Sequence, residues 1–253
     1  MSNMRVIFIG AGRGIRLMPT TADEPKCFAR VRGKRILDWN LEAFAANGLE
    51  EVVFIGGYQI EKVKRDYPQF TFRHNDNWAN NNILASLMYA EDLMDQPFIC
   101  CYSDTLYSPG IVRGLLESTE DITLSVDTGW AARYEHRLEH PASDAEKVTV
   151  LNGIVTEIHR DIEEAKAHGE YTGVAKFSKE GAALLKGHYK MCRDVYMGSP
   201  FREAALFEKA YLIHLLQEMI EKGVTMHHTD TVSEYIEIDT QEDFEYAQKH
   251  WRQ

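Results

Sequence analysis

The sequence is poor in the features that mark exported, disulfide-bonded or membrane proteins. It has four cysteines in 253 residues, Cys27, Cys100, Cys101 and Cys192, and no C-x-x-C pair. We therefore expect buried, reduced thiols without a metal or redox role. No apolar run approaches the ~18 residues of a membrane span, and the apolar stretch near the start is too short for a signal peptide. These absences favour a cytoplasmic protein with no membrane partner.

Positive charge is also scarce. The chain has 28 Lys/Arg against 39 Asp/Glu, a net charge of −11. Residues 1–36 are the exception, with eight Lys/Arg and two Asp/Glu. An acidic protein with one basic segment is a poor nucleic-acid binder, so we expect no nucleic-acid partner. The basic segment suits a small polyanion.

Apolar runs alternate with helical patterns in the first part of the chain. The expected strands are Arg5–Ile9, Glu51–Ile55, Phe70–His74 and Pro97–Tyr102. The expected helices are Ile36–Asn47, Ile60–Asp66 and Asn82–Leu93. This alternation predicts an α/β fold with a mostly parallel sheet flanked by helices.

The second part has a different pattern. We expect strands at Asp121–Asp127, Lys147–His159 with a turn at Asn152-Gly153, Tyr171–Ser178 and Ser233–Ile238. A long helix is expected over Phe201–Lys222, and a terminal helix from about Gln241. Because no linker interrupts the chain, we predict one domain over residues 1–253. It would consist of a core (1–120), an inserted mixed α/β region (121–232) and a closing strand and helix (233–253).

A glycine-rich turn, Gly10-Ala11-Gly12-Arg13-Gly14, directly follows the first strand. Glycines let main-chain N–H groups approach a phosphate closely. A dinucleotide fingerprint would need a small residue where Ile15 stands, and an acidic residue at the end of the second strand, which instead ends in Gly56-Gly57-Tyr58. No Gly-Lys-Ser/Thr occurs either. An oxidoreductase and a P-loop enzyme are therefore disfavoured.

Two cations follow the glycines and would grip a triphosphate at two points. Arg16 comes directly after the turn, and Lys26 follows Pro25 ten residues later. The stretch from Gly10 through Pro25-Lys26 resembles the signature of the sugar-phosphate nucleotidyltransferase family. It departs from that signature at Ile15, where the family prefers Ser or Thr.

A second resemblance narrows the branch. Asp38–Gly48 followed by Val52–Tyr58 resembles the helix–strand–"GY" segment of the family. His74-Asn75-Asp76, Asn80-Asn81-Asn82 and Ser86-Leu87 resemble the segment of the phosphocholine and 2-aminoethylphosphonate cytidylyltransferases. Asparagine amides both donate and accept, which suits an amino-pyrimidine edge. The alternative is an Asn-rich turn that caps the helix at Asn82.

The resemblance implies a Rossmann-like fold and a nucleotide site. The nucleotide-binding residues would be Gly10, Ala11, Gly12, Arg13, Gly14, Gly57, Tyr58, Asn80, Asn81, Asn82 and Ser86. Asp104, at a strand end, and Asp239 match the metal aspartates of the family, so Mg²⁺ is the expected cofactor. Without the resemblance, each would be read as a turn or helix-cap residue.

The implied reaction transfers CMP from CTP to a small phosphorylated or phosphonylated amine or amide. An acceptor oxygen attacks the α-phosphorus and pyrophosphate leaves. Arg16 would stabilise the pyrophosphate, and Lys26 would hold the α-phosphate or the acceptor.

The acceptor-binding residues would include Lys147, Arg160, Trp130, Tyr171 and Tyr196, although core packing is the competing reading of the aromatics. Glu135, Glu170 and Asp194 are possible partners for an ammonium group. His136, His140, His227 and His228 have no convincing third metal ligand, so we expect ordinary surface or core histidines.

Two other functions stay open. One is a sugar-1-phosphate nucleotidyltransferase that uses UTP or dTTP. The other is a non-catalytic nucleotide sensor, which would be expected to have lost the Arg/Lys pair or the metal carboxylates. The sequence does not predict the oligomeric state.

Overall fold

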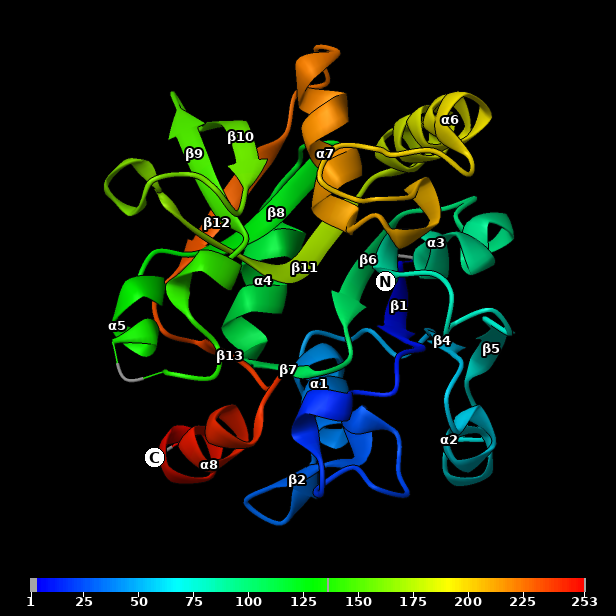
Figure 1. Ribbon diagram of the computed structural model, residues 1–253, viewed down its shortest axis with the longest axis vertical. Helices are drawn as coiled ribbons and strands as arrows, with labels where there is room; N and C mark the ends of the chain where they lie inside the picture. The colour runs from blue at the N-terminus through cyan, green and yellow to red at the C-terminus, as the bar shows by residue number, and fades with distance from the viewer. Residues whose placement is uncertain (1–3, 136, 253) are drawn as a thin grey trace.

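A mixed nine-stranded sheet forms the centre of the molecule (Figure 1). The computed structural model describes residues 4–135 and 137–252. The strand order is β5-β4-β1-β6-β11-β8-β12-β10-β9. Its first four strands are β5 (Thr71–His74), β4 (Val52–Gly56), β1 (Arg5–Gly10) and β6 (Phe98–Tyr102), and they run parallel. This is the arrangement that the alternation of strand and helix predicts.

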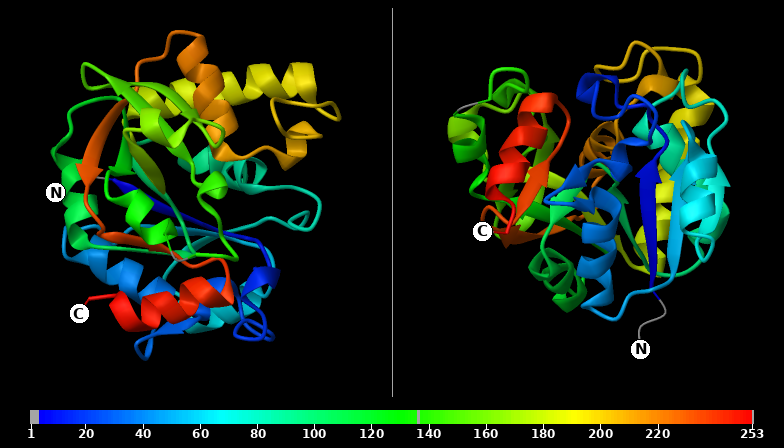
Figure 2. Two further views of the ribbon diagram at one scale, coloured as in Figure 1. Left: turned by 60° about the vertical axis from the view of Figure 1, so that its left-hand side comes forward. Right: turned by 90° about the horizontal axis from the view of Figure 1, so that it is seen from below.

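Side chains of β1 alternate between two hydrophobic layers, one on each face of the sheet. Val6 and Phe8 pack on one face, whereas Ile7 and Ile9 pack on the other. The first face is covered by α1 (Ile36–Ala45), α2 (Ile60–Asp66) and α4 (Pro109–Glu117). The second is covered by α3 (Ile83–Leu87), α6 (Lys179–Tyr196) and α7 (Leu212–Glu221). The sheet is therefore the middle of three layers (Figure 2).

The second half of the sheet is antiparallel in most of its pairings. β11 (Gly169–Phe177) pairs antiparallel with β6 and with β8 (Ile122–Asp127). β12 (His227–Thr231) is parallel to β8 and antiparallel to β10 (Ile154–His159), which forms a hairpin with β9 (Lys147–Leu151). Because β9 also pairs with β11, the last five strands form a closed ring of pairings.

The other strands and α-helices lie outside the nine-stranded sheet. They are β2 (Arg30–Val31), β3 (Lys34–Arg35), β7 (Thr105–Tyr107), α5 (Trp130–Tyr134), β13 (Tyr235–Glu237) and α8 (Gln241–His250). Antiparallel pairing of β13 with β7 brings the end of the chain beside the residues that follow β6.

The prediction of one long helix over Phe201–Lys222 is wrong. The helix is limited to α7, and the residues before it form a loop with a 3₁₀ turn at Phe207–Lys209. The buried residues of that loop recur every three positions, so their apolar spacing imitates a helical face; they are Phe201, Ala204, Phe207 and Ala210. The predicted helix Asn82–Leu93 also divides, into α3 and a 3₁₀ segment over Met88–Leu93 in which Ala90 has non-helical backbone angles.

The sequence analysis missed α6. Its mean hydropathy is low and it contains two glycines, which weaken a helical pattern. The local start signal is Ser178, whose hydroxyl accepts a hydrogen bond from the Gly181 N–H at 3.0 Å. In the described part of the chain, no helix combines the length and the apolar character needed to cross a membrane.

Candidate active site

The glycine turn after β1 forms one wall of a cavity of about 430 Å³. We call it the loop cavity. Gly14 has a left-handed backbone with φ 65°, and a Cβ there would lie 2.8 Å from the Lys26 side chain, so only glycine fits. The predicted residues that line the cavity are Gly10, Ala11, Gly12, Arg13, Gly14, Arg16, Lys26, Asn81, Asn82, Ser86, Asp104 and Asp239.

Two carboxylates from distant parts of the chain meet in the loop cavity. Asp104 follows β6 and Asp239 follows β13, and pairing of β13 with β7 places them side by side. The backbone N–H of Ile238 donates to the Asp104 carbonyl at 3.0 Å, which fixes this register.

Lys26 lies between these carboxylates. Its Nζ is 2.7 Å from Asp104 Oδ2 and also bonds Asp239, which in turn pairs with Arg16. Burial alone would lower the pKa of Lys26, but Asp104 and Asp239 outweigh it and hold the pKa above its ordinary value. The ammonium group thus stays charged and neutralises the carboxylate pair.

The residues present fit a hard divalent cation. Asp104 and Asp239 offer carboxylate oxygens at the rim of a cavity with a phosphate-type loop, which is the donor set that Mg²⁺ prefers. Glu237 and His140 also lie close to Asp239, with their ligand atoms within 4.8 Å of one another. Two carboxylates therefore contact Lys26, and a third, Glu237, lies next to Asp239.

The asparagine segment lines the loop cavity and is held by a buried amide network. Asn75 donates to Asn81 Oδ1 at 2.8 Å and to Ser86 Oγ at 2.9 Å, and Asn81 donates back to Asn75 Oδ1 at 3.0 Å. Asn82 caps α3 by accepting from the N–H of Ile83 at 2.9 Å. The capping alternative therefore holds for Asn82, although its side chain also lines the cavity.

Three predicted nucleotide-binding residues, Gly57, Tyr58 and Asn80, are not among the residues that line the loop cavity. A Cβ on Gly57 would lie 2.7 Å from the Ala11 carbonyl, so glycine permits this close packing. Tyr58 donates its backbone N–H to the same carbonyl at 2.9 Å. Asn80 bonds Asn77 at 2.8 Å. The sequence analysis missed Trp78, which lines the cavity and meets the Tyr58 ring edge-on.

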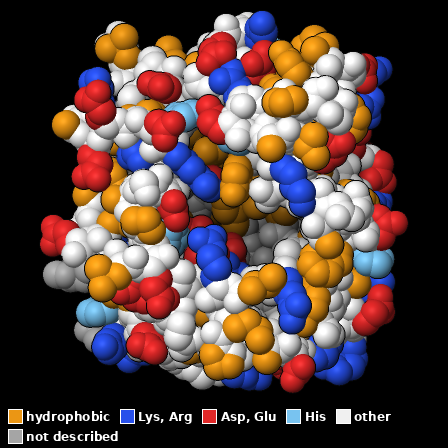
Figure 3. All heavy atoms as spheres, viewed as in Figure 1, with side chains coloured by type: hydrophobic (Ala, Val, Ile, Leu, Met, Phe, Trp, Pro, Cys, Tyr) orange, Lys and Arg blue, Asp and Glu red, His pale blue; other side chains and the backbone are white. Residues whose placement is uncertain are grey.

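A second cavity of about 270 Å³ adjoins the first, and Arg16 and Asp239 line both. We call it the polar cavity. Figure 3 shows a hollow near the centre of this face, with Lys and Arg side chains around it and acidic side chains inside. The further residues that line the polar cavity are Tyr102, His140, Asp144, Glu146, Arg160, Glu170, Tyr171, Tyr211, Tyr235 and Glu237.

Of the predicted acceptor-binding residues, only Arg160 and Tyr171 line the polar cavity. Lys147 is buried and donates to the Ala142 carbonyl at 3.2 Å. Trp130 packs edge-on against Tyr134, and Tyr196 packs against Phe201. The two aromatic side chains thus pack as their alternative reading describes, and none of the three residues lines the polar cavity.

The carboxylates named as ammonium partners lie in different surroundings. Glu170 lines the polar cavity, but Arg133 and the Tyr134 hydroxyl, at 2.5 Å, already bond it. Asp194 pairs with its neighbour Arg193 on the surface of α6, and Glu135 is exposed. The sequence analysis missed Glu146, which stands directly before the lysine that it selected.

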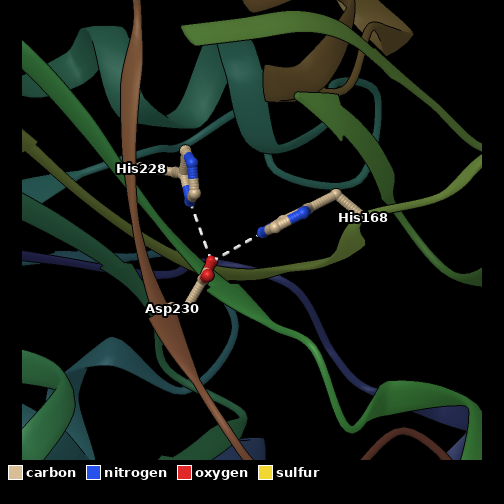
Figure 4. A group of neighbouring side chains, drawn as sticks. All are labelled: His168, His228 and Asp230. Atoms are coloured by element: carbon tan, nitrogen blue, oxygen red, sulfur yellow. Dashed lines mark hydrogen bonds and ion pairs between the residues drawn. The ribbon is translucent and has the colours of Figure 1, made fainter. Parts of the chain in front are cut away.

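The predictions for two histidines, His228 and His140, need correction. His228 lies beside His168 and Asp230, and Asp230 Oδ1 accepts from both imidazoles at 2.8 and 2.9 Å (Figure 4). A third potential ligand is therefore present beside His228, as it is beside His140, which lies near Glu237 and Asp239. His140 is fixed by Asp243 at 3.1 Å, and His136 lies outside the described residues.

Curated relatives match over most of the chain. A CTP:phosphoglutamine cytidylyltransferase from Campylobacter jejuni is 29% identical over 96% of this chain and 98% of the relative. A UTP–glucose-1-phosphate uridylyltransferase from Haloferax volcanii is 26% identical over 69% of this chain and 72% of the relative. A choline-phosphate cytidylyltransferase from Streptococcus pneumoniae is 25% identical over 66% and 79%. No family model matches the chain.

A solved structure confirms the fold. The inositol-1-phosphate CTP transferase from T. maritima superposes with a TM-score of 0.73 at 22% identity, covering 98% of this chain and 96% of that one. The fold, the glycine loop and the paired aspartates agree in class: the chain resembles the sugar-phosphate nucleotidyltransferase family. Within the family it resembles the cytidylyltransferases that act on small phospho-compounds, as its asparagine segment predicts.

Proposed function

We propose that this protein transfers CMP from CTP to a small phosphorylated or phosphonylated amine or amide. The observation that carries the proposal is the junction of two cavities at Arg16 and Asp239. One cavity has a phosphate-type glycine loop, and the other has the polar lining that an amine-bearing acceptor requires. The near full-length relative that acts on phosphoglutamine supports the same substrate class.

In this proposal, an anionic oxygen of the acceptor attacks the α-phosphorus of CTP. The new P–O bond forms as the bond to pyrophosphate breaks, and the pyrophosphate leaves with the electron pair. The acceptor is already ionised, so no strong general base is needed, and catalysis is positioning with charge neutralisation. Arg16 would face the leaving pyrophosphate, and the glycine-loop N–H groups would hold the phosphates.

Asp104 and Asp239 would hold Mg²⁺. The metal supplies positive charge that neutralises phosphate oxygens as the P–O bond breaks. Lys26 lines the same cavity beside both carboxylates, so its ammonium would bind a phosphate oxygen there. Four buried free cysteines suit a reducing compartment, and we place the reaction in the cytoplasm.

The test is a pyrophosphate-release screen of CTP, UTP, dTTP and ATP against a panel of acceptors. The panel contains phosphoglutamine, phosphocholine, 2-aminoethylphosphonate and a sugar 1-phosphate, and products are identified by mass spectrometry. We expect CTP with an amine- or amide-bearing acceptor to give the highest kcat/KM. Preference for UTP or dTTP with the sugar phosphate would support the alternative enzyme. Nucleotide binding without pyrophosphate release from any pair would support the sensor.

A further inference from the structure

The polar cavity contains a buried carboxylate that has little bonding. Glu146 is 8% exposed. Its contacts are the Tyr102 hydroxyl at 3.3 Å and Arg160 Nη2 at 3.4 Å, both at the long end of the hydrogen-bond range. A carboxylate can accept about four hydrogen bonds, and burying one with so few is unfavourable. Glu146 therefore retains capacity for a donor that enters the cavity.

Arg160 is the complementary group on the same wall. Its guanidinium lies over the Tyr211 ring, 4.1 Å from the centroid, which fixes its plane. Its Nε is buried without a hydrogen-bond partner, as is the hydroxyl of Tyr171. The fork of a guanidinium matches a carboxylate, so Arg160 also retains capacity, in this case for an anion.

Other charged groups set the sign of the cavity without competing for these two positions. Glu170 is already bonded by Arg133 and Tyr134, and Glu237 lies 3.5 Å from His140. Acidic side chains outnumber the arginines in the lining. The polar cavity therefore favours a ligand with a cationic group, and Arg160 provides one position for an anionic group beside it.

The aromatic side chains do not form an open cage for a quaternary ammonium. Arg160 covers the face of Tyr211, and Arg133 lies over Tyr235 at 4.8 Å. Tyr102 and Tyr171 meet edge-on with centroids 6.1 Å apart. A choline-type cation uses open ring faces and offers no N–H donors, whereas Glu146 needs donors.

We infer that the acceptor carries the free α-ammonium and α-carboxylate of an amino acid, with Glu146 binding the ammonium and Arg160 binding the carboxylate. This inference rests on the proposed function, because it assigns the polar cavity to the acceptor. The phosphoryl group would sit on the side chain of the amino acid and reach the loop cavity at Arg16 and Asp239. Recognition of two opposite charges by two neighbouring residues excludes simple phospho-amines from efficient turnover.

The test uses CTP, Mg²⁺ and three matched acceptors: glutamine phosphorylated on its side chain, its analogue without the α-carboxylate and its analogue without the α-ammonium. Phosphocholine is the fourth acceptor. We expect the complete acceptor to exceed each analogue in kcat/KM by roughly 10- to 100-fold, the size of one charged hydrogen-bonded contact. Arg160→Met should lose turnover of the complete acceptor and leave the analogue without a carboxylate unaffected. Glu146→Gln should show the mirror-image pattern.

Three further measurements distinguish a role of Arg160 in acceptor binding from a purely structural role. Arg160→Lys should recover part of the loss, the KM for CTP should stay constant, and Arg193→Met on the surface of α6 should behave as wild type. Equal losses for all acceptors in the Arg160 and Glu146 variants, or efficient use of phosphocholine, would overturn the inference while leaving cytidylyl transfer intact. Absence of pyrophosphate release with every acceptor would overturn the proposed function, and the inference with it.

Discussion

The two cavities differ in how the chain builds them. Most of the loop cavity comes from three short segments, Gly10–Arg16, Trp78–Ser86 and the pair Ser103-Asp104, and it lies at the ends of parallel strands. The polar cavity is built from side chains scattered along the chain, from Arg16 and Tyr102 to Asp239, and each element contributes only one or two of them. A contiguous segment leaves a motif in the sequence, whereas dispersed side chains do not. Variants in the loop cavity should impair every acceptor, and variants in the polar cavity should discriminate among acceptors.

The largest effect is expected for the metal carboxylates. Asp104→Asn and Asp239→Asn should each reduce kcat by roughly 10³, the size that several kcal/mol of lost charge stabilisation implies. EDTA should abolish turnover of the wild type, and added Mg²⁺ should restore it. Steady-state rates with all four acceptors provide the measurement. Full activity of either variant would show that the aspartates are structural.

The next effect concerns Lys26 and Arg16. Lys26→Met and Arg16→Ala should each lower kcat/KM by roughly 10²–10³, by analogy with the loss of one preorganised donor. Arg16→Lys should recover only part of the activity, because the planar fork is lost. Near-normal turnover at saturating CTP and acceptor would contradict a catalytic role for either residue.

The two cations should differ in stability. The Arg16 side chain is 59% exposed, so its removal should hardly change the melting temperature. Lys26 is buried between Asp104 and Asp239, and its replacement leaves two carboxylates without their cation. Lys26→Met should therefore melt several degrees lower without metal, and Mg²⁺ should restore part of the loss. Equal melting curves with and without Mg²⁺ would argue against shared use of the carboxylates.

The fold was predictable where local pattern and tertiary environment agree. The parallel half follows from apolar strands that alternate with amphipathic helices, and apart from the divided helix Asn82–Leu93 its boundaries agree within one or two residues. The antiparallel half was harder because β12 is polar and pairs through distant contacts. The loop before α7 buries aromatic residues as a helix would, so its apolar spacing misleads. The spacing of apolar residues indicates which side chains are buried, but buried side chains occur in packed loops as well as in helices.

The candidate site was likewise predictable only where its residues lie close together in the sequence. Gly14, Arg16 and Lys26 could be assigned to one cavity from the sequence because they follow the first strand at short spacings, and all three line the loop cavity. Glu146 was missed because nothing local distinguishes it from any surface glutamate; its burial depends on Tyr102 and Arg160, which are far away in the chain. Lys147 was selected through the family resemblance. Neighbouring side chains point in opposite directions in extended backbone, and in the structure Glu146 lines the cavity whereas Lys147 does not.

A moderate effect is expected from pH. Burial raises the pKa of Glu146 to about 7, although Arg160 opposes the shift; the neighbouring groups are Tyr102, Glu170 and Arg160 itself. Ionised Glu146 binds an ammonium group, so the KM for the zwitterionic acceptor should fall about tenfold between pH 6 and pH 8. Glu146→Gln should remove this dependence, and the analogue without an ammonium should not show it. A constant KM for the complete acceptor would contradict the assignment.

The same group affects stability with a defined sign. A carboxyl whose pKa is raised on folding binds its proton more tightly in the folded state. The free energy of unfolding should therefore decrease as the pH rises from about 4.5, the ordinary value, to about 7. Denaturant titrations at several pH values should show a smaller decrease over this window for Glu146→Gln. A larger decrease in the variant would contradict the raised pKa.

The smallest effect concerns the choice of nucleotide base. The Asn81 amide is held by its reciprocal hydrogen bonds with Asn75 and lines the loop cavity, which leaves one N–H and one lone pair for a base edge. Asn81→Ala should reduce the CTP-to-UTP ratio of kcat/KM by about fivefold, the size of one neutral hydrogen bond. Asn80→Ala is the matched control, because Asn80 bonds Asn77 outside the cavity. An equal change in both variants, or a wild type that turns over UTP as well as CTP, would show that the asparagine segment shapes the loop without reading the base.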